Sequence, residues 1–285
     1  MYVSNFHEVA QLMAGTRKSA RLKFRDGAEF EFSRENFKRP LYLLLKIRAK
    51  GMPIQTEQDF FKASFKFKGR QIELEGPDAL GLAVEVFFGG EYLMLCPDGM
   101  AVVDIGANIG DTAIFFAASG AKRVVSLEPY PYSHSLAKAN ITNNKLAGKV
   151  RLLNAAMGGS IGEITLDERE KSLGGSQLYS KKAGKAIPML TLKKLVEDED
   201  IRNAVLKCDC EGCEYEIFLS SEDRVLRRFR RIMMEYHYGH VNLSEKLSRA
   251  GFKVSVIRRP EYTFNRGWEK PHSRTGILYA ELGDG

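Results

Sequence analysis

The stretch VVDIGANIGDTAIFFA, residues Val102–Ala117, decides the fold class. It begins as a short valine-rich run, passes through a turn that contains Gly106, Asn108 and Gly110, and continues as an apolar segment with helical spacing. A buried strand, a glycine-containing turn and a helix form the repeating unit of open α/β sheets, in which ligands bind at the carboxyl ends of the strands. Glycine suits such a turn because it lets the backbone bend tightly and a ligand approach closely.

Short apolar runs and helical segments alternate downstream of this stretch. The pattern predicts strands at 101–105, 123–128, 150–157, 204–210, 230–236, 252–258 and 275–282. Helical segments separate all but the last two strands, which predicts a doubly wound, seven-stranded, mainly parallel α/β sheet with helices on both faces. The last two strands follow each other without a helix, which favours an antiparallel strand at the sheet edge.

The first part of the chain has a different pattern. Alternating apolar and polar residues predict two hairpins, around Asp26-Gly27 and Gly69-Arg70, and a helix lies between them at 39–51. We therefore expect a smaller N-terminal α+β region over 1–75, a candidate for substrate binding, followed by the α/β domain over 76–285.

Charge is distributed unevenly along the chain, which has a net charge of +7. Residues 1–70 carry 15 Lys and Arg against 7 Asp and Glu, 71–222 carry 15 against 22, and 223–285 carry 13 against 7. Basic ends around an acidic middle fit either a solvated surface or a patch for an anionic partner such as RNA.

Nothing in the sequence indicates export or membrane insertion. There is no apolar run of the length that spans a bilayer, and the first residues do not form a signal peptide. The four cysteines lack the spacing of a secreted disulfide framework, so we expect a cytoplasmic location.

Two acids beside the glycine turn indicate the kind of ligand. Asp104 lies two residues before Gly106, and Glu128 ends the next strand, where a carboxylate can accept both ribose hydroxyls of a nucleoside. A domain that binds NAD is the rival, but the turn lacks the pattern G-x-G-x-x-G. An acid before the first glycine suits the cationic amino-acid end of S-adenosylmethionine (SAM) better than a pyrophosphate. Asn154, at the end of the third strand, is expected to meet the adenine.

Candidate catalytic residues follow the fourth and fifth strands. Asp209 and Glu211 lie in LKCDCEGCEYEIF (206–218), and His237 lies in MEYHYGH (234–240). A carboxylate there can orient a substrate hydroxyl, accept its proton or bind a metal, and a histidine is a natural general base or a hydrogen-bonding surface residue. Either Asp209 or His237 is our candidate for the base.

Three of the cysteines fall in this same region, as C-x-C-x2-C at 208, 210 and 213. They lack a fourth ligand in sequence, and alternate residues of a strand point to opposite faces. We therefore predict no metal site and interpret the cysteines as small buried hydrophobic residues.

The ordered set of motifs resembles the FkbM-type methyltransferases. The matching pieces lie between Phe65 and Leu282 and comprise EVFFGGEY (85–92), VVDIGANIGDTAIFFA (102–117), SLEPYP (126–131), LLNAAMG (152–158), TLKKLV (191–196), LKCDCEGCEYEIF (206–218) and MEYH (234–237). The resemblance implies a class I methyltransferase fold with SAM as its cofactor. It implies SAM contacts from Asp104, Gly106, Asn108, Gly110 and Glu128, with the Asn154–Ala155 turn near the adenine. It also places Asp209 and Glu211 at the active site.

The same resemblance favours methyl transfer to a hydroxyl oxygen of a sugar, glycan or small metabolite. An RNA (tRNA) methyltransferase is the first alternative, because the N-terminal region and the stretches RRFRR (227–231), IRRPEY (257–262) and FNRGWEKPHSR (264–274) are basic. The last two stretches also contain aromatic residues of the types that stack on bases. A SAM-binding module without catalysis is the second. The stretch 171–186 is expected to form a loop near the site.

Overall fold

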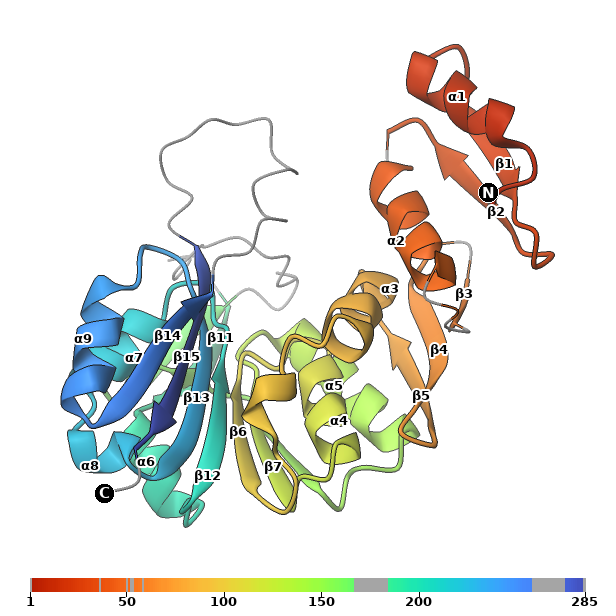
Figure 1. Ribbon diagram of the computed structural model, residues 1–285. Helices are drawn as coiled ribbons and strands as arrows, with labels where there is room; N and C mark the ends of the chain where they lie inside the picture. The colour runs from red at the N-terminus through yellow and green to blue at the C-terminus, as the bar shows by residue number, and fades with distance from the viewer. Residues whose placement is uncertain are drawn as a thin grey trace. The chain divides into compact units, whose positions relative to one another are not determined.

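The computed structural model describes residues 2–35, 37–49, 51, 54–57, 59–166, 184–257 and 275–283. The chain divides into two compact units, Met1–Glu91 and Tyr92–Gly285 (Figure 1). This division falls later than the expected boundary at 75/76. The reason is that Leu80 and Val84 are buried in the same apolar cluster as the N-terminal strands.

The N-terminal unit has the expected α+β character. Its elements are α1 (Phe6–Ala14), β1 (Ser19–Lys23), β2 (Glu29–Ser33), α2 (Lys38–Ala49), β3 (Ile54–Thr56), β4 (Lys62–Phe67), β5 (Arg70–Glu75), α3 (Ala79–Leu82) and the π-helical η1 (Ala83–Phe88). Strands β1 and β2 pair antiparallel, as do β4 and β5, so both predicted hairpins are confirmed. Phe30 and Phe32 stack on Phe60 in the core of this unit.

A seven-stranded sheet organises the second unit, as predicted. Its strands are β6 (Ala101–Ile105), β7 (Arg123–Leu127), β8 (Val150–Leu153), β12 (Ala204–Cys208), β13 (Phe229–Tyr236), β14 (Phe252–Ile257) and β15 (Gly276–Leu282). Their order across the sheet is β14-β15-β13-β12-β6-β7-β8. The five strands from β13 to β8 are mutually parallel, and the chain crosses over after β8 to continue at β12 on the other side of β6.

The last strand is antiparallel, as expected, but it does not lie at the edge. Strand β15 pairs antiparallel with β13 and with β14, so it fills the gap between them and leaves β14 at the edge. The burial pattern explains this position: Ile277, Leu278 and Ala280 of β15 are buried, whereas β14 alternates between covered and exposed residues as an edge strand does.

Helices cover both faces of this sheet. They are α4 (Asp111–Ala118), α5 (Pro131–Asn143), α6 (Leu192–Asp198), α7 (Glu214–Ser220), α8 (Asp223–Leu226) and α9 (Val241–Arg249), with a 3-10 turn η2 at Leu93–Leu95. Figure 1 shows α4 and α5 on one face and α6, α7 and α9 on the other. The segment between β12 and β13 forms two short helices, α7 and α8, because Ser221 between them is in an extended conformation.

A small second sheet in this unit was not predicted. Strands β9 (Ala156–Met157), β10 (Gly162–Leu166) and β11 (Lys185–Leu190) have the order β10-β11-β9. Most of the stretch 171–186 that was expected to form a loop, and nearly all of 257–274, lie outside the described residues. Among the described helices, none combines the length and the apolar character needed to cross a bilayer.

Candidate functional site

The predicted site residues meet at one edge of the large sheet, where its parallel strands end. The loop after β6 is bonded to both neighbouring strands: the amides of Gly106 and Ala107 donate to the carbonyl of Leu127, each at 3.0 Å, and the Asp209 amide donates to the carbonyl of Ile105 at 3.0 Å. The glycine turn, the end of β7 and the loop after β12 therefore form one connected backbone assembly.

The glycines of the turn are explained by contacts within the chain. Gly106 has φ +80°, and a Cβ atom placed on it would lie 1.8 Å from the Asp209 carbonyl oxygen. Gly110 has φ +87°, and a Cβ atom there would lie 3.1 Å from Cα of Ala137 in α5. The sequence-based explanation was close approach of a ligand; what the structure shows is close approach of neighbouring loops and helices.

Asp104 is fully buried and holds the centre of this assembly. Its carboxylate accepts hydrogen bonds from the hydroxyls of Thr112 (2.8 Å) and Ser126 (3.2 Å), and it forms an ion pair with Lys207 at 3.2 Å. A SAM contact from Asp104 stays a prediction, because the structure uses its carboxylate to tie three chain segments together.

Lys207 is the partner that sequence reasoning missed. It lies in β12 with its side chain 2% exposed, and its ammonium donates to the carbonyls of Ile105 (3.2 Å) and Gly106 (2.6 Å). Burial favours the neutral amine, but the charges of Asp104, Asp209 and Asp111 outweigh it and raise the pKa of Lys207. A lysine inside the otherwise apolar run AVLKC was the available signal, because a buried lysine requires an acidic partner.

Glu128 ends β7 in a position that suits a ribose. Its carboxylate accepts one backbone hydrogen bond on each oxygen, from Asn108 at 2.8 Å and from Tyr130 at 3.0 Å. Burial raises its pKa to about 7, although both amides oppose that shift. Each oxygen keeps a second lone pair for another donor.

The Asn154–Ala155 turn lies beside this glutamate. The Asn154 amide nitrogen donates to the carbonyls of Glu128 (3.0 Å) and Pro129 (2.9 Å), and Ala155 is buried. Asn154 therefore braces the end of β7, and its expected contact with the adenine stays a prediction.

The structure brings Asp209, Glu211 and His237 together, and their role as the active site stays a prediction. The first two follow β12 and the third follows β13, and one possible ligand atom from each lies within 4.8 Å of the other two. The positive φ of Glu211, +56°, turns its side chain into this group. Nothing in the sequence alone fixed the distances, because they depend on the pairing of β12 with β13.

His237 is held between two carboxylates. Its Nε2 lies 3.3 Å from Glu211 and its Nδ1 lies 3.0 Å from Glu214, whose side chain is fully buried. Burial lowers the pKa of His237, but the two glutamates outweigh it and raise the pKa to about 11. The ring is therefore protonated at neutral pH and is a poor general base in this state.

Three acids at this edge, Glu235, Asp111 and Asp209, have raised pKa values. Burial, with the negative charge of Asp209 beside it, raises the pKa of Glu235 to about 8. Burial also raises the pKa of Asp111, to about 7, against the opposing charge of Lys207. Burial likewise raises the pKa of Asp209, again opposed by Lys207. Perturbed acids that gather in one place are typical of functional sites.

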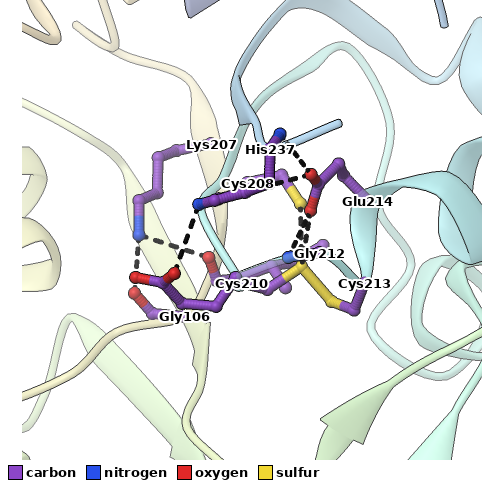
Figure 2. The surroundings of a disulfide bond; sticks show 10 residues. Gly106, Lys207, Cys208, Cys210, Gly212, Cys213, Glu214 and His237 are labelled. Atoms are coloured by element: carbon purple, nitrogen blue, oxygen red, sulfur yellow. Dashed lines mark hydrogen bonds and ion pairs between the residues drawn. A yellow bond between two sulfur atoms is a disulfide. The ribbon is translucent and has the colours of Figure 1, made fainter. Parts of the chain in front are cut away.

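The cysteines correct one prediction. Cys210 and Cys213 form a disulfide across the loop after β12, and the thiol of Cys208 lies 3.7 Å from the Cys210 sulfur (Figure 2). Only Cys208 and Cys96 are free, so the interpretation of all three as small hydrophobic residues holds for Cys208 alone. Cysteine spacing thus no longer argues for a cytoplasmic location, which stays a prediction.

Comparison with known families agrees with this arrangement. The profile of the methyltransferase FkbM domain matches residues 104–254, which is more than half of the chain and includes every strand end described above. The chain belongs to the FkbM methyltransferase family. It is therefore a methyltransferase with SAM as its cofactor, as the sequence motifs indicated.

Solved structures with a similar fold are distant in sequence. An rRNA methylase of Streptococcus thermophilus has 9% identity and a TM-score of 0.42, over 70% of this chain and 96% of that one. A candidate SAM-dependent methyltransferase of Streptococcus mutans has 9% identity and a TM-score of 0.46, over 97% and 79%. The TrmK protein of M. capricolum, bound to S-adenosylhomocysteine, has 12% identity and a TM-score of 0.40, over 67% and 66%. No curated protein matches the sequence.

The charges and unused lone pairs of this FkbM domain can be compared with the chemistry of SAM. The Glu128 carboxylate has unused lone pairs for ribose hydroxyls, and the acids that follow β12 and β13 give this end of the sheet a negative charge that suits a cation. These residues therefore fit a cationic nucleoside.

Proposed function

We propose that this FkbM enzyme methylates a hydroxyl oxygen of a sugar, glycan or small metabolite. The observation that carries the proposal is the state of Asp209. Within the described part of the chain its carboxylate accepts no hydrogen bond, while burial raises its pKa. A carboxylate that is positioned, lacks a donor and holds a proton readily is suited to accept the proton of a hydroxyl.

The reaction needs few protein groups. When bound, SAM would supply the electrophilic methyl carbon for the acceptor oxygen, and S-adenosylhomocysteine would be the neutral thioether product. The hydroxyl proton passes to Asp209. Holding the two reactants in line supplies much of the acceleration, and a positioned base contributes about 10²- to 10⁴-fold more.

His237 has a different role in this proposal. Because its pKa is raised to about 11, it stays an imidazolium between Glu211 and Glu214 and fixes the loop after β12. Of the two candidates for the base, the proposal therefore assigns the role to Asp209.

RNA is the second candidate acceptor, because the N-terminal residues are basic. Many of those charges are already paired within the unit: Arg17 with Glu8, Arg21 with Glu31, Lys23 with Glu29, Arg39 with Asp78, Arg48 with Asp26 and Lys62 with Glu75. Pairing reduces the field available to a phosphate backbone. We propose that this unit helps to select a small or glycan acceptor.

The test is methyl transfer from SAM with a labelled methyl group. The full-length protein is incubated with monosaccharides, oligosaccharides and hydroxylated metabolites, and in parallel with tRNA and rRNA transcripts. We expect label in a hydroxyl acceptor, reduced at least about hundredfold by Asp209→Asn. The exposed Glu216→Gln is the matched control and should be unaffected. Label that enters RNA alone, or full activity of Asp209→Asn, would contradict the proposal.

A further inference from the structure

Two carboxylates and one imidazole surround a common point at the ends of β12 and β13. Asp209, Glu211 and His237 each direct one possible ligand atom there, and these atoms lie within 4.8 Å of one another. A set of two oxygen ligands and one nitrogen ligand matches the donors that divalent first-row metals accept. The three side chains come from loops on adjacent paired strands, so the group is held by the sheet.

The orientation of His237 is already that of a metal ligand. Its Nδ1 is bonded to Oε1 of the fully buried Glu214 at 3.0 Å, and the backbone amide of His237 donates to the same oxygen at 3.0 Å. The other oxygen of Glu214 accepts from the Gly212 amide at 2.9 Å. Figure 2 shows this glutamate between the histidine and the disulfide loop. A buried carboxylate on one ring nitrogen commonly fixes a histidine whose other nitrogen binds a metal.

The charges around the point favour a cation. The acids that act on one another here are Asp209, Glu211, Glu214 and Glu235, and the nearby cations are Lys207 and His237. Lys207 is already committed to Asp104 and to two backbone carbonyls. The Asp209 carboxylate, in the part of the chain that the structure describes, accepts no hydrogen bond, although the charges of Lys207 and His237 act on it.

We propose that Asp209, Glu211 and His237 bind one divalent first-row metal ion through carboxylate oxygens and Nε2. The ion takes the place of the Nε2 proton that His237 carries in the ion-free protein. Glu214 is the positioning residue for His237. This part of the proposal concerns only the protein and does not depend on the acceptor. Cys210 and Cys213 form a disulfide, so neither offers a thiolate to a metal ion.

A second part rests on the proposed O-methylation. An ion held by Asp209, Glu211 and His237 would attract a hydroxyl oxygen and favour loss of its proton, as a metal does for bound water. Each carboxylate has two oxygens, so Asp209 can bind the ion with one and accept the proton with the other. The acceptor class is then a compound with two adjacent oxygens, such as a vicinal diol, which can chelate a metal.

The experiment measures Mn²⁺ binding by electron paramagnetic resonance, with full-length protein freed of metal by a chelator and without SAM or acceptor. We expect one saturable Mn²⁺ site per chain. Affinity should fall at least about tenfold in His237→Gln and in Glu211→Gln, and about ten- to hundredfold in Glu214→Gln.

Two matched control variants change residues that lie close in sequence to the proposed ligands. His240→Gln replaces a histidine that contacts Ser244, and Glu216→Gln replaces an exposed acid of α7. Both should bind Mn²⁺ as the wild type does. Glu211, with 43% of its side chain exposed, can be changed with little risk to folding, so the test stands even if a His237 variant unfolds.

Absence of saturable Mn²⁺ binding, or equal binding by wild type, Glu211→Gln and His237→Gln, would overturn the metal site. Binding with the expected losses supports it whatever the acceptor panel shows. If Mn²⁺ binds but no hydroxyl compound is methylated, the proposed O-methylation fails and the metal site stands.

Discussion

Acids at two places on the same sheet edge have opposite surroundings. At the ends of β6 and β7, Asp104 and Glu128 are buried and accept hydrogen bonds from Thr112, Ser126, Asn108 and Tyr130. At the ends of β12 and β13, Asp209 has no such donor within the described residues, and His237 is held by glutamates alone.

The difference separates two tasks. A carboxylate that accepts hydrogen bonds from its own protein fixes loop geometry, and a cofactor-binding turn needs this before SAM binds. A carboxylate without donors keeps its capacity for a proton, a metal or a substrate hydroxyl. We therefore assign shape and cofactor binding to the first region and chemistry to the second.

The largest expected effect is a loss of unfolding free energy in the region of Asp104 and Glu128. Lys207→Met leaves the buried Asp104 carboxylate without its cation, and we expect the free energy of unfolding to fall by about 3–5 kcal/mol. Urea denaturation measures it. Lys194→Met is the control, because its partner Asp198 is exposed and the pair contributes about 0.5 kcal/mol at most. Equal stability of the two variants would mean that Asp104 is not anchored by Lys207.

The second-largest effect is expected where Gly106 approaches the Asp209 carbonyl, because this contact joins the two regions. Gly106→Ala adds a Cβ atom 1.8 Å from the Asp209 carbonyl, at a φ of +80°, and should cost about 2–4 kcal/mol of unfolding free energy or displace the loop after β12. Gly99→Ala has a similar φ, +69°, but no atom within 4 Å, so it should cost about 1 kcal/mol. Thermal unfolding of both variants measures the difference. If they lose the same amount, the backbone approach is not tight.

The disulfide should have a moderate effect on the chemical region. Cys210 and Cys213 are three residues apart, so the chain-entropy relation gives about 2 kcal/mol for closing the loop. Cys213→Ser, or a dithiol reductant, should lower the unfolding free energy by that amount. Cys96→Ser changes a free, exposed cysteine and should have no effect. A reductant that leaves the stability of the wild type unchanged would argue against the disulfide.

The smallest expected effect is the pH dependence of SAM binding. Burial raises the pKa of Glu128 to about 7, and ribose hydroxyls bind the ionised carboxylate best. SAM affinity should therefore rise up to about tenfold between pH 6 and pH 8, as the group deprotonates. Calorimetry at several pH values measures this. Glu128→Gln cannot ionise and should give a weak, flat profile; the same rise in that variant would place the titrating group elsewhere.

Much of the architecture could be predicted because hydrophobic periodicity is local. The strands at 101–105, 123–127 and 204–208 and both N-terminal hairpins follow from short apolar patterns. The insertion of β15 between β13 and β14 could not be predicted, because strand order depends on contacts between residues far apart in sequence.

The sequence indicated which residues belong to the candidate site better than it indicated what each residue does. Glycines, acids and a histidine at strand ends were visible in the sequence, but the burial of Asp104 and the double contact of His237 depend on partners such as Lys207 and Glu214. These partners lie more than 20 residues away from the residues that they hold. Their roles require three-dimensional proximity, which no local pattern contains.

The most direct test of the division of tasks is calorimetry of SAM binding to wild type, Glu128→Ala and Asp209→Asn, with NAD as a control ligand. We predict that the wild type binds SAM and not NAD, and that Glu128→Ala loses SAM binding. Asp209→Asn should retain SAM binding but lose methyl transfer. SAM binding that survives Glu128→Ala but is lost in Asp209→Asn, or a preference for NAD, would contradict this division of tasks.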